Sequence, residues 1–230
     1  MGDGSRCVKF NLAPSVRTVF LPVKTLFISA VLVTLGGTAA PVSGQSPPPS
    51  KEYVRRIAQQ AGPEAPAPAT QERLQRYASR IRYFSGLVYT RTGITVDADF
   101  VRALIAAESG ARPRAVSEDG AVGLMQIRPE TGRRAARKLY ASGYDFRYVD
   151  RDRLQSLQAQ DLKDPAVNIL IGCYLLDRYN AAFGGHLGRT IGAWNAGPDR
   201  VRQDEGTPPF QETLGLLTQV NAFYLFFRRR

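Results

Sequence analysis

A glutamate stands where a helix normally carries apolar side chains. In the segment from Asp97 to Gly110, the residues three, four and seven positions before Glu108 are an isoleucine, a leucine and a valine, which share one helical face. Gly110 is typical of a helix C-terminus, where the helix dipole disfavours an ionised carboxylate. Because burial acts in the same direction, we expect a raised pKa for Glu108. A carboxylic acid that keeps its proton near neutral pH suits general acid catalysis.

The burial pattern alone leaves a structural alternative open, in which the carboxylate of Glu108 reaches solvent at the helix end. Perturbed acids also occur in structural networks, so the pattern does not choose between the two interpretations. The motifs that follow Glu108 in the chain favour the catalytic one.

Three further motifs follow, namely Gly123-Leu-Met-Gln126, Asn168-Ile-Leu-Ile-Gly172 and Ala193-Trp-Asn-Ala-Gly-Pro198. Together with Glu108-Ser-Gly110, this series resembles the motifs of the lytic transglycosylase catalytic domain, a family related in fold to goose-type lysozyme. The resemblance runs from about residue 74 to the C-terminus. Each motif is weak alone, whereas four motifs in the right order and with fitting spacing make a specific signal.

The resemblance implies cleavage by a single acid. Most glycoside hydrolases use two carboxylates, but Glu118 and Asp119 lie in a polar turn, and Glu130 suits a helix start. In the implied reaction on peptidoglycan, Glu108 protonates the oxygen of a MurNAc-GlcNAc β-1,4 bond. The 2-acetamido group of MurNAc stabilises the anomeric carbon, and Glu108 then takes the proton of the 6-hydroxyl of MurNAc. The product is a 1,6-anhydromuramyl end.

The same resemblance implies a set of substrate-binding residues. In that set, Gly123 permits a close approach of backbone to sugar, Met125 offers an apolar contact, and Gln126 hydrogen-bonds the glycan or orients Glu108. For Met125, core packing is an equally good alternative on residue type. The full set comprises Ser109, Ser117, Gly123, Leu124, Met125, Gln126, Trp194 and Asn195.

Two late positions depart from the family pattern. The family usually has a tyrosine at the position of Trp194, and again at the position of Phe210, within a segment that resembles Pro-Tyr-x-Glu-Thr. An indole can only donate through its N–H group and stack on a sugar. We therefore predict stacking and cleft shape as the role of Trp194, rather than orientation of Glu108.

Other functions fit the sequence less well. A hydrolytic muramidase would share the fold and Glu108, and the product mass distinguishes it. A weakly active glycan-binding component of a secretion apparatus is the alternative from another class, which the intact Glu108-Ser-Gly110 motif disfavours. The net charge of +11 suits acidic polymers and anionic lipids as well as nucleic acid, and expected export makes nucleic acid the last choice.

The N-terminal third is expected to precede the folded domain. Residues 1–44 combine basic residues, a short apolar run and small residues, which indicates a signal peptide or, as the alternative, an N-terminal anchor. Residues 45–70 have the Pro/Ala-rich composition of a linker, and residues 71–230 form the expected catalytic domain. We therefore expect an exported protein of the bacterial periplasm or cell envelope. An association with membrane or a secretion complex stays open, as does the oligomeric state.

Helical periodicity dominates the expected domain. The pattern predicts a first helix from about residue 71 to residue 91, then the Glu108 helix, and further helices at 129–140, 165–179, 187–196 and from about 213. Residues 141–164 show no clear periodicity and are interpreted as an insertion beside the cleft. No period-two strand of useful length is present. The fold class is therefore mainly α, as a lysozyme-like helical domain with a substrate cleft.

The chain offers few metal ligands. It contains two cysteines and one histidine, His186, which lies in a glycine-rich segment. Cys173 falls in an apolar run and is expected to be a buried free thiol, whereas Cys7 belongs to the expected signal segment. We predict no metal site and no cofactor.

Overall fold

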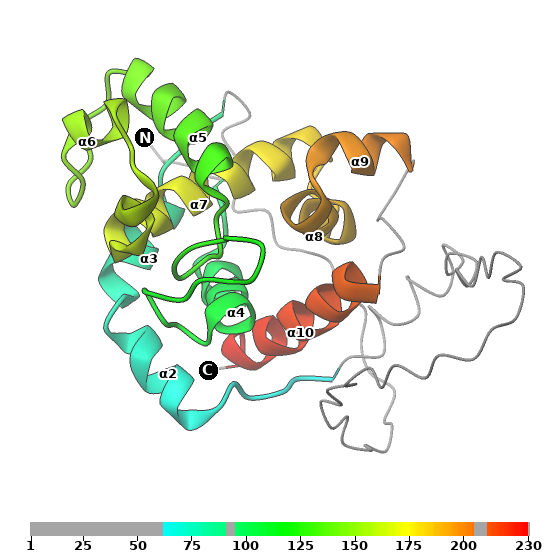
Figure 1. The fold of residues 1–230 in the computed structure, drawn as a ribbon. Coiled ribbons are helices and arrows are strands. Elements are labelled where there is room, and N and C mark those ends of the chain that lie inside the picture. The colour runs from blue at the N-terminus through cyan, green and yellow to red at the C-terminus, as the bar shows by residue number, and fades with distance from the viewer. Residues whose placement is uncertain (1–61, 91–94, 205–210, 230) are drawn as a thin grey trace, which may run out of the picture.

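The computed structural model describes residues 62–90, 95–204 and 211–229. The expected signal segment, 1–44, and most of the expected linker lie outside the described residues. The elements are α2 (Pro68–Gln75), α3 (Ala78–Ser85), α4 (Ala98–Ser109), α5 (Pro129–Ala141), α6 (Arg151–Gln155), the 3-10 turn η1 (Ala159–Lys163), α7 (Pro165–Ala182), α8 (Leu187–Ala196), α9 (Pro198–Gln203) and α10 (Gln211–Phe227) (Figure 1). Between these described residues, β pairing is limited to isolated bridges. The mainly α fold class is confirmed.

Helix α4 positions the candidate acid. It begins at Asp97, whose side chain accepts hydrogen bonds from the backbone N–H groups of Asp99 and Phe100 at 2.8 and 3.3 Å. It ends at Gly110, where φ is +57°, a left-handed conformation that glycine adopts without strain. Its apolar face is buried, and each such side chain contributes about 1.5–3 kcal/mol. That face packs along α10 (Figure 1).

Helix α7 is the central element of the core. Most of its residues are buried on every side, which marks an internal helix rather than an amphipathic surface helix. It begins at Asp164, whose side chain accepts a hydrogen bond from the backbone N–H of Ala166 at 2.8 Å, and Pro165 occupies the first helical position. α3, α5, α8 and η1 all pack against it.

The single helix expected near residues 71–91 is two helices. α2 ends at Gln75 and α3 begins at Ala78, because Tyr77 has φ −108° and ψ −1°, outside regular helix geometry. The apolar residues on both sides of the break still face the core. The spacing of apolar residues is therefore continuous across the break, although the helix is interrupted. Residues 68–70, assigned to the linker by composition, form the first turn of α2, with Pro68 at its start.

Two further segments contain helices that the periodicity did not predict. Residues 141–164 contain α6 and η1, which are too short to show a helical repeat. α9 follows Pro198 directly after α8 and was not expected. The last helix agrees with its prediction as a core helix, since Tyr224 and Phe227 are buried. None of the described helices is long and apolar enough to cross a membrane.

Candidate active site

The carboxyl group of Glu108 meets an indole from a distant part of the chain. Glu108 lies in the last turn of α4 and is partly buried. The Nε1–H group of Trp194, on α8, donates a hydrogen bond to its Oε1 atom at 2.8 Å. This contact contradicts the prediction that Trp194 does not orient Glu108. Because an indole cannot accept a hydrogen bond, a proton on Glu108 is not used by Trp194, and Oε2 is the oxygen that the indole leaves free.

The electrostatic surroundings poise Glu108 near neutrality. Burial raises its pKa from 4.5 to about 7, the hydrogen bond from Trp194 lowers it, and the nearby carboxylate of Glu212 raises it. The sequence-based expectation of a raised pKa is thus confirmed, with burial as the main cause. An acid with a pKa near the working pH can give a proton in one step and take one in the next.

Ser109 fastens the end of α4 to the loop that carries the Gly123-Leu-Met-Gln126 motif. Its Oγ atom lies 2.7 Å from the carbonyl oxygen of Leu124, to which it donates, and it accepts a hydrogen bond from the backbone N–H of Arg112 at 3.2 Å. The side chain is buried. Ser109 therefore holds the site together from inside, and its hydroxyl group is committed to the protein.

Asn168 anchors the same loop from α7, a role that sequence reasoning did not assign. Its Oδ1 atom accepts from the backbone N–H of Met125 at 2.8 Å, and its Nδ2 group donates to the carbonyl oxygens of Val122 and Leu162 at 2.9 and 2.8 Å. The side chain is fully buried. The motif Asn168-Ile-Leu-Ile-Gly172 carried the signal, since a buried asparagine in an apolar run requires partners.

Gly123 is required for packing on this anchor. It has φ +86°, and a Cβ atom there would collide with the Leu162 carbonyl oxygen and the Asn168 amide. The structure therefore gives a packing reason for this glycine, and its approach to a sugar stays a prediction.

The side chains of Leu124 and Met125 are in the core. Neither is exposed, and a Cβ atom on Gly172 of α7 would overlap the Met125 sulfur. The alternative of core packing therefore describes Met125, and any contact of these two residues with a substrate falls to their backbone.

Gln126 has an unusual backbone and a committed amide nitrogen. Its φ of +43° lies in the left-handed region, which is uncommon for a residue other than glycine and typical of functional sites. Its Nε2 group donates to the carbonyl oxygens of Gly123 and Ala115 at 2.9 and 3.4 Å. Within the described ranges no hydrogen bond to its amide oxygen is present, so that oxygen is the group left for a ligand.

The remaining predicted binding residues have different surroundings. Ser117 is exposed in the loop before Gly123, and its Oγ atom accepts from the backbone N–H of Ala121 at 3.0 Å. Asn195 follows Trp194 on α8, and its Nδ2 group donates to Oγ1 of Thr213 on α10 at 2.9 Å. This bond ties α8 to α10, on the side from which Trp194 reaches Glu108.

Glu212 is a second carboxylate near Glu108, and sequence reasoning did not consider it as a partner acid. It is exposed in the first turn of α10 and close enough to Glu108 to raise its pKa. The segment resembling Pro-Tyr-x-Glu-Thr contained the signal. The acids that were considered lie elsewhere: Asp119 pairs with Arg128 at 3.4 Å, and Glu130 is in the first turn of α5. Over the described ranges, no three His, Cys, Asp or Glu side chains gather as a metal site would require.

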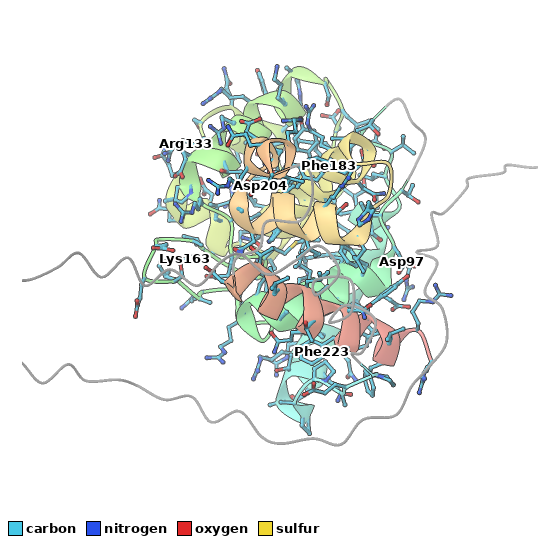
Figure 2. The ribbon with its side chains drawn as sticks, turned by 90° about the vertical axis from the view of Figure 1, so that its right-hand side faces the viewer. Asp97, Arg133, Lys163, Phe183, Asp204 and Phe223 are labelled. Atoms are coloured by element: carbon cyan, nitrogen blue, oxygen red, sulfur yellow. The ribbon has the colours of Figure 1, made fainter. Side chains whose placement is uncertain are left out.

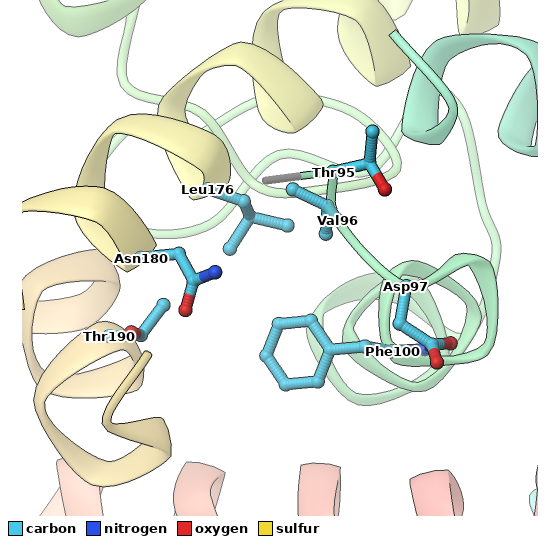
Figure 3. A pocket seen from close by; sticks show the side chains of 7 residues that line it. All are labelled: Thr95, Val96, Asp97, Phe100, Leu176, Asn180 and Thr190. Atoms are coloured by element: carbon cyan, nitrogen blue, oxygen red, sulfur yellow. The ribbon is translucent and has the colours of Figure 1, made fainter. Parts of the chain in front are cut away.

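A small enclosed cavity lies near the opposite end of α4. Its volume is about 10 Å³, which admits roughly one water molecule and excludes a sugar. The cavity is lined by Thr95, Val96, Asp97, Phe100, Leu176, Asn180 and Thr190 (Figure 3). It is therefore separate in position and size from the surroundings of Glu108.

Comparison with known proteins agrees with this arrangement. The family model described as the transglycosylase SLT domain matches residues 91–214. The soluble lytic murein transglycosylase of Escherichia coli K12 is 29% identical over 150 residues, which cover 60% of this chain and 21% of that protein. The endo-type membrane-bound lytic murein transglycosylase A of Klebsiella pneumoniae is 38% identical over 82 residues, covering 35% of this chain and 34% of that protein.

Comparison with solved structures also finds lytic transglycosylases. The 70 kDa soluble lytic transglycosylase in complex with bulgecin A superposes with a TM-score of 0.55 at 27% identity, covering 70% of this chain and 25% of that one. The crystal structure of the 70 kDa enzyme from Escherichia coli gives a TM-score of 0.50 at 28% identity, covering 66% and 24%. The matching part of the chain thus spans about a fifth to a third of these relatives.

Proposed function

Because the chain belongs to the transglycosylase SLT domain family, we propose that it cleaves peptidoglycan as a lytic transglycosylase. The scissile bond is the β-1,4 bond between MurNAc and GlcNAc, and the product carries a 1,6-anhydromuramyl end. Relatives that match this chain are named lytic murein transglycosylases, which supports the substrate class. Glu108 is the single acid and base.

The observation that carries this proposal is the environment of Glu108. Its carboxyl group is partly buried, its pKa is raised to about 7, and its hydrogen-bond partner is a pure donor. In the described residues, the other carboxylate that acts on it is Glu212, which is exposed on α10. A single poised acid suits a reaction in which the substrate supplies its own nucleophile.

The proposed reaction has two steps. In the first, Oε2 of Glu108 gives its proton to the glycosidic oxygen, the bond from that oxygen to C1 breaks, and the acetamido oxygen of the same sugar bonds to C1. In the second, the Glu108 carboxylate takes the proton of the 6-hydroxyl, O6 bonds to C1, and the acetamido oxygen leaves. Glu108 is protonated again and no water is consumed. Trp194 holds Oε1 throughout, which keeps Oε2 directed at the substrate.

The same site also fits a hydrolytic muramidase, in which water replaces the 6-hydroxyl in the second step. Mass spectrometry of products from purified murein sacculi separates the two reactions. We expect disaccharide products lighter by one water than the hydrolysis products. Products with a free reducing end as the main species would contradict transglycosylase activity and favour the muramidase.

Peptidoglycan also determines where the protein would act. A peptidoglycan-cleaving enzyme works at the cell wall, so we propose the periplasm or cell envelope as its location. Fractionation of cells followed by detection of the chain tests this placement. Recovery of the mature chain in the cytoplasm alone would contradict it.

A further inference from the structure

The outer face of α5 is strongly basic. Arg133, Arg134, Arg137 and Lys138 fall within six consecutive positions and are all exposed, against one acid, Glu130, in the first turn. Like charges three or four residues apart on a helix repel one another. Such a face therefore favours an anionic partner.

Two of these arginines, Arg133 and Arg137, line a surface hollow. They are four residues apart, so their side chains project from the same face of α5 toward the segment that ends α6. Figure 1 shows α5 and α6 side by side, and Figure 2 labels Arg133 at the surface. The hollow has a volume of about 140 Å³, against roughly 10–15 Å³ for one water molecule. Its other lining residues are Leu154, Gln155, Ser156, Leu157 and Gln158.

Among the described residues, these two guanidinium groups have no ion-pair partner, in contrast to that of Arg153. Arg153, in α6, forms ion pairs with Asp161 and Asp164 at 3.0 and 2.8 Å. Both carboxylates therefore already have a cationic partner. Neither Arg133 nor Arg137 forms an ion pair or hydrogen bond with any residue that the structure describes. Two guanidinium groups that line one hollow and have no partner among the described residues can both donate to the same oxyanion.

The rest of the lining indicates what is attached to that anion. Leu154 and Leu157 lie beneath the hollow and are 0% and 3% exposed, so they shape it and leave almost no surface for a ligand. Gln155, Ser156 and Gln158 are exposed and add amide and hydroxyl groups at the rim. These groups can pair with the N–H and C=O groups of a peptide backbone that carries the anion. A bare phosphate group would use the arginines and leave the carbonyl oxygens of the amide groups unused.

The hollow shares its framework with the candidate active site. Gly132, next to Arg133, packs closely against Leu162, where a Cβ atom would lie 3.2 Å from the leucine methyl carbons. The carbonyl oxygen of Leu162 in turn accepts from Asn168, which anchors Met125. α5 begins shortly after Gln126, and at about 1.5 Å of rise per residue Arg133 and Arg137 lie roughly 6 and 12 Å along its axis from Pro129.

We propose that the hollow between α5 and α6 binds a short, carboxylate-bearing peptide through Arg133 and Arg137. This inference rests on the proposed function, because peptidoglycan strands carry short acidic peptides, and it names the part of the polymer that the enzyme recognises outside its cleft. A carboxylate is held by the two guanidinium groups, and the peptide backbone pairs with the exposed groups of Gln155, Ser156 and Gln158. The peptide thereby fixes the position of the attached glycan strand relative to Glu108.

Calorimetric titration of the full chain tests the proposal. The Glu108→Gln variant is used so that no substrate is consumed. The probes are the tripeptide Ala-Glu-Ala, its neutral counterpart Ala-Gln-Ala amide, and inorganic phosphate. The double variant Arg133→Gln/Arg137→Gln is compared with Arg134→Gln/Lys138→Gln, which makes the same charge change on the same helix outside the hollow, since Arg134 instead donates to Thr131 at 3.3 Å.

We expect Ala-Glu-Ala to bind with a Kd at least about tenfold lower than that of the neutral peptide or of phosphate. The hollow variant should raise that Kd at least about tenfold, and the control variant by less than about twofold, with binding weakened by added salt. Equal losses in both double variants would overturn the proposal in favour of unspecific charge attraction. Phosphate that binds through Arg133 and Arg137 more tightly than the peptide does would overturn it in favour of a phosphate-bearing ligand.

These outcomes are independent of the proposed function. Cleavage of murein by the wild-type chain with no peptide binding at the hollow would refute this inference and leave the function standing. Peptide binding by a wild-type chain that does not cleave murein would refute the function and leave the hollow as a peptide site. The two failures are therefore distinguishable.

Discussion

Glu108 and Asp177 are both acids whose pKa is raised by burial, and they differ in their place in the fold, their exposure and their contacts. The pKa of Glu108 is raised to about 7 and that of Asp177, on α7, to about 6. Glu108 ends a helix beside a loop with strained backbone, and an indole from another helix holds one of its oxygens. Asp177 is almost fully buried inside α7. The Thr90 side chain lowers the pKa of Asp177. Burial, and after it the Asp177 carboxylate, raises the pKa of the Cys173 thiol.

The comparison shows that a raised pKa does not identify a catalytic acid. Burial produces the shift in both cases, so the shift reports the loss of water around each carboxyl group. What distinguishes Glu108 is that its donor is an indole from another helix and that the residue is partly exposed. Asp177 is not accessible to a substrate, and its protonation affects the free energy of unfolding.

The largest expected effect comes from removing the proton donor. Glu108→Gln should lower the rate of murein cleavage by at least about 10²–10⁴-fold, because the amide has nearly the same volume and cannot act as general acid. Product release from purified sacculi measures the rate. Asp177→Asn makes the matched change at the other buried acid and should leave the rate within about twofold. Similar losses in the two variants would break the comparison.

The Trp194 contact should govern the pH dependence of the reaction. Because Glu108 must begin protonated, kcat/KM should fall as the pH rises through about 7. The indole hydrogen bond lowers the pKa of Glu108, so Trp194→Phe should move this fall to higher pH and reduce kcat. A pH–rate profile of the wild type and the variant measures both effects. An unshifted profile would show that the contact does not act on the acid.

The stacking role of Trp194 stays a prediction beside the orienting role. If the ring also stacks on a sugar, Trp194→Ala should weaken substrate binding in addition, by about 1–3 kcal/mol on the scale of base stacking. Comparing KM and kcat in the Phe and Ala variants separates the two roles, since phenylalanine keeps an aromatic face and loses the donor. A rise in KM alone for both variants would leave stacking as the only role.

The smallest expected effect is on stability. The folded-state pKa of Asp177 is raised, so its protonated form stabilises the fold fully below about pH 4, the unfolded value, and this contribution is lost as the pH rises through about 6. Asp177→Asn should remove that dependence and stabilise the protein at pH 7 by on the order of 1–3 kcal/mol. Urea unfolding at pH 4 and pH 7 measures it. A variant that is less stable than the wild type at pH 7 would show that the carboxylate has a partner on which the fold depends.

Much of the fold was accessible from the sequence because it depends on local signals. The helix ends at Gly110, Pro129 and Pro165 follow from the glycine C-cap and from the fixed φ of proline, and the structure confirms them. The break at Tyr77 was not accessible, because the apolar residues keep the same spacing on both sides of it. α6 and η1 are shorter than the repeat on which periodicity depends.

The candidate site divides in the same way. The raised pKa of Glu108 follows from its own helix, whereas its contact with Trp194 joins residues 86 positions apart. Likewise, Gly123 and Met125 are attributed to packing only once Asn168 and Gly172 of α7 are placed against them. Residue types indicated where the chemistry lies, and tertiary contacts determined which side chains hold it in place.

One measurement addresses the pairing of Glu108 with Trp194 most directly. Trp194 is the only tryptophan of the chain, so its fluorescence reports on its own surroundings. A charge that appears on the carboxyl group 2.8 Å from the indole nitrogen should change the emission. We predict a titration of the emission with a midpoint near pH 7 that is absent in Glu108→Gln. The midpoint should persist in His186→Asn, a control that removes the single histidine of the chain, at the start of α8. Emission that does not change between pH 5 and 9, or that titrates equally in Glu108→Gln, would contradict a poised acid held by Trp194.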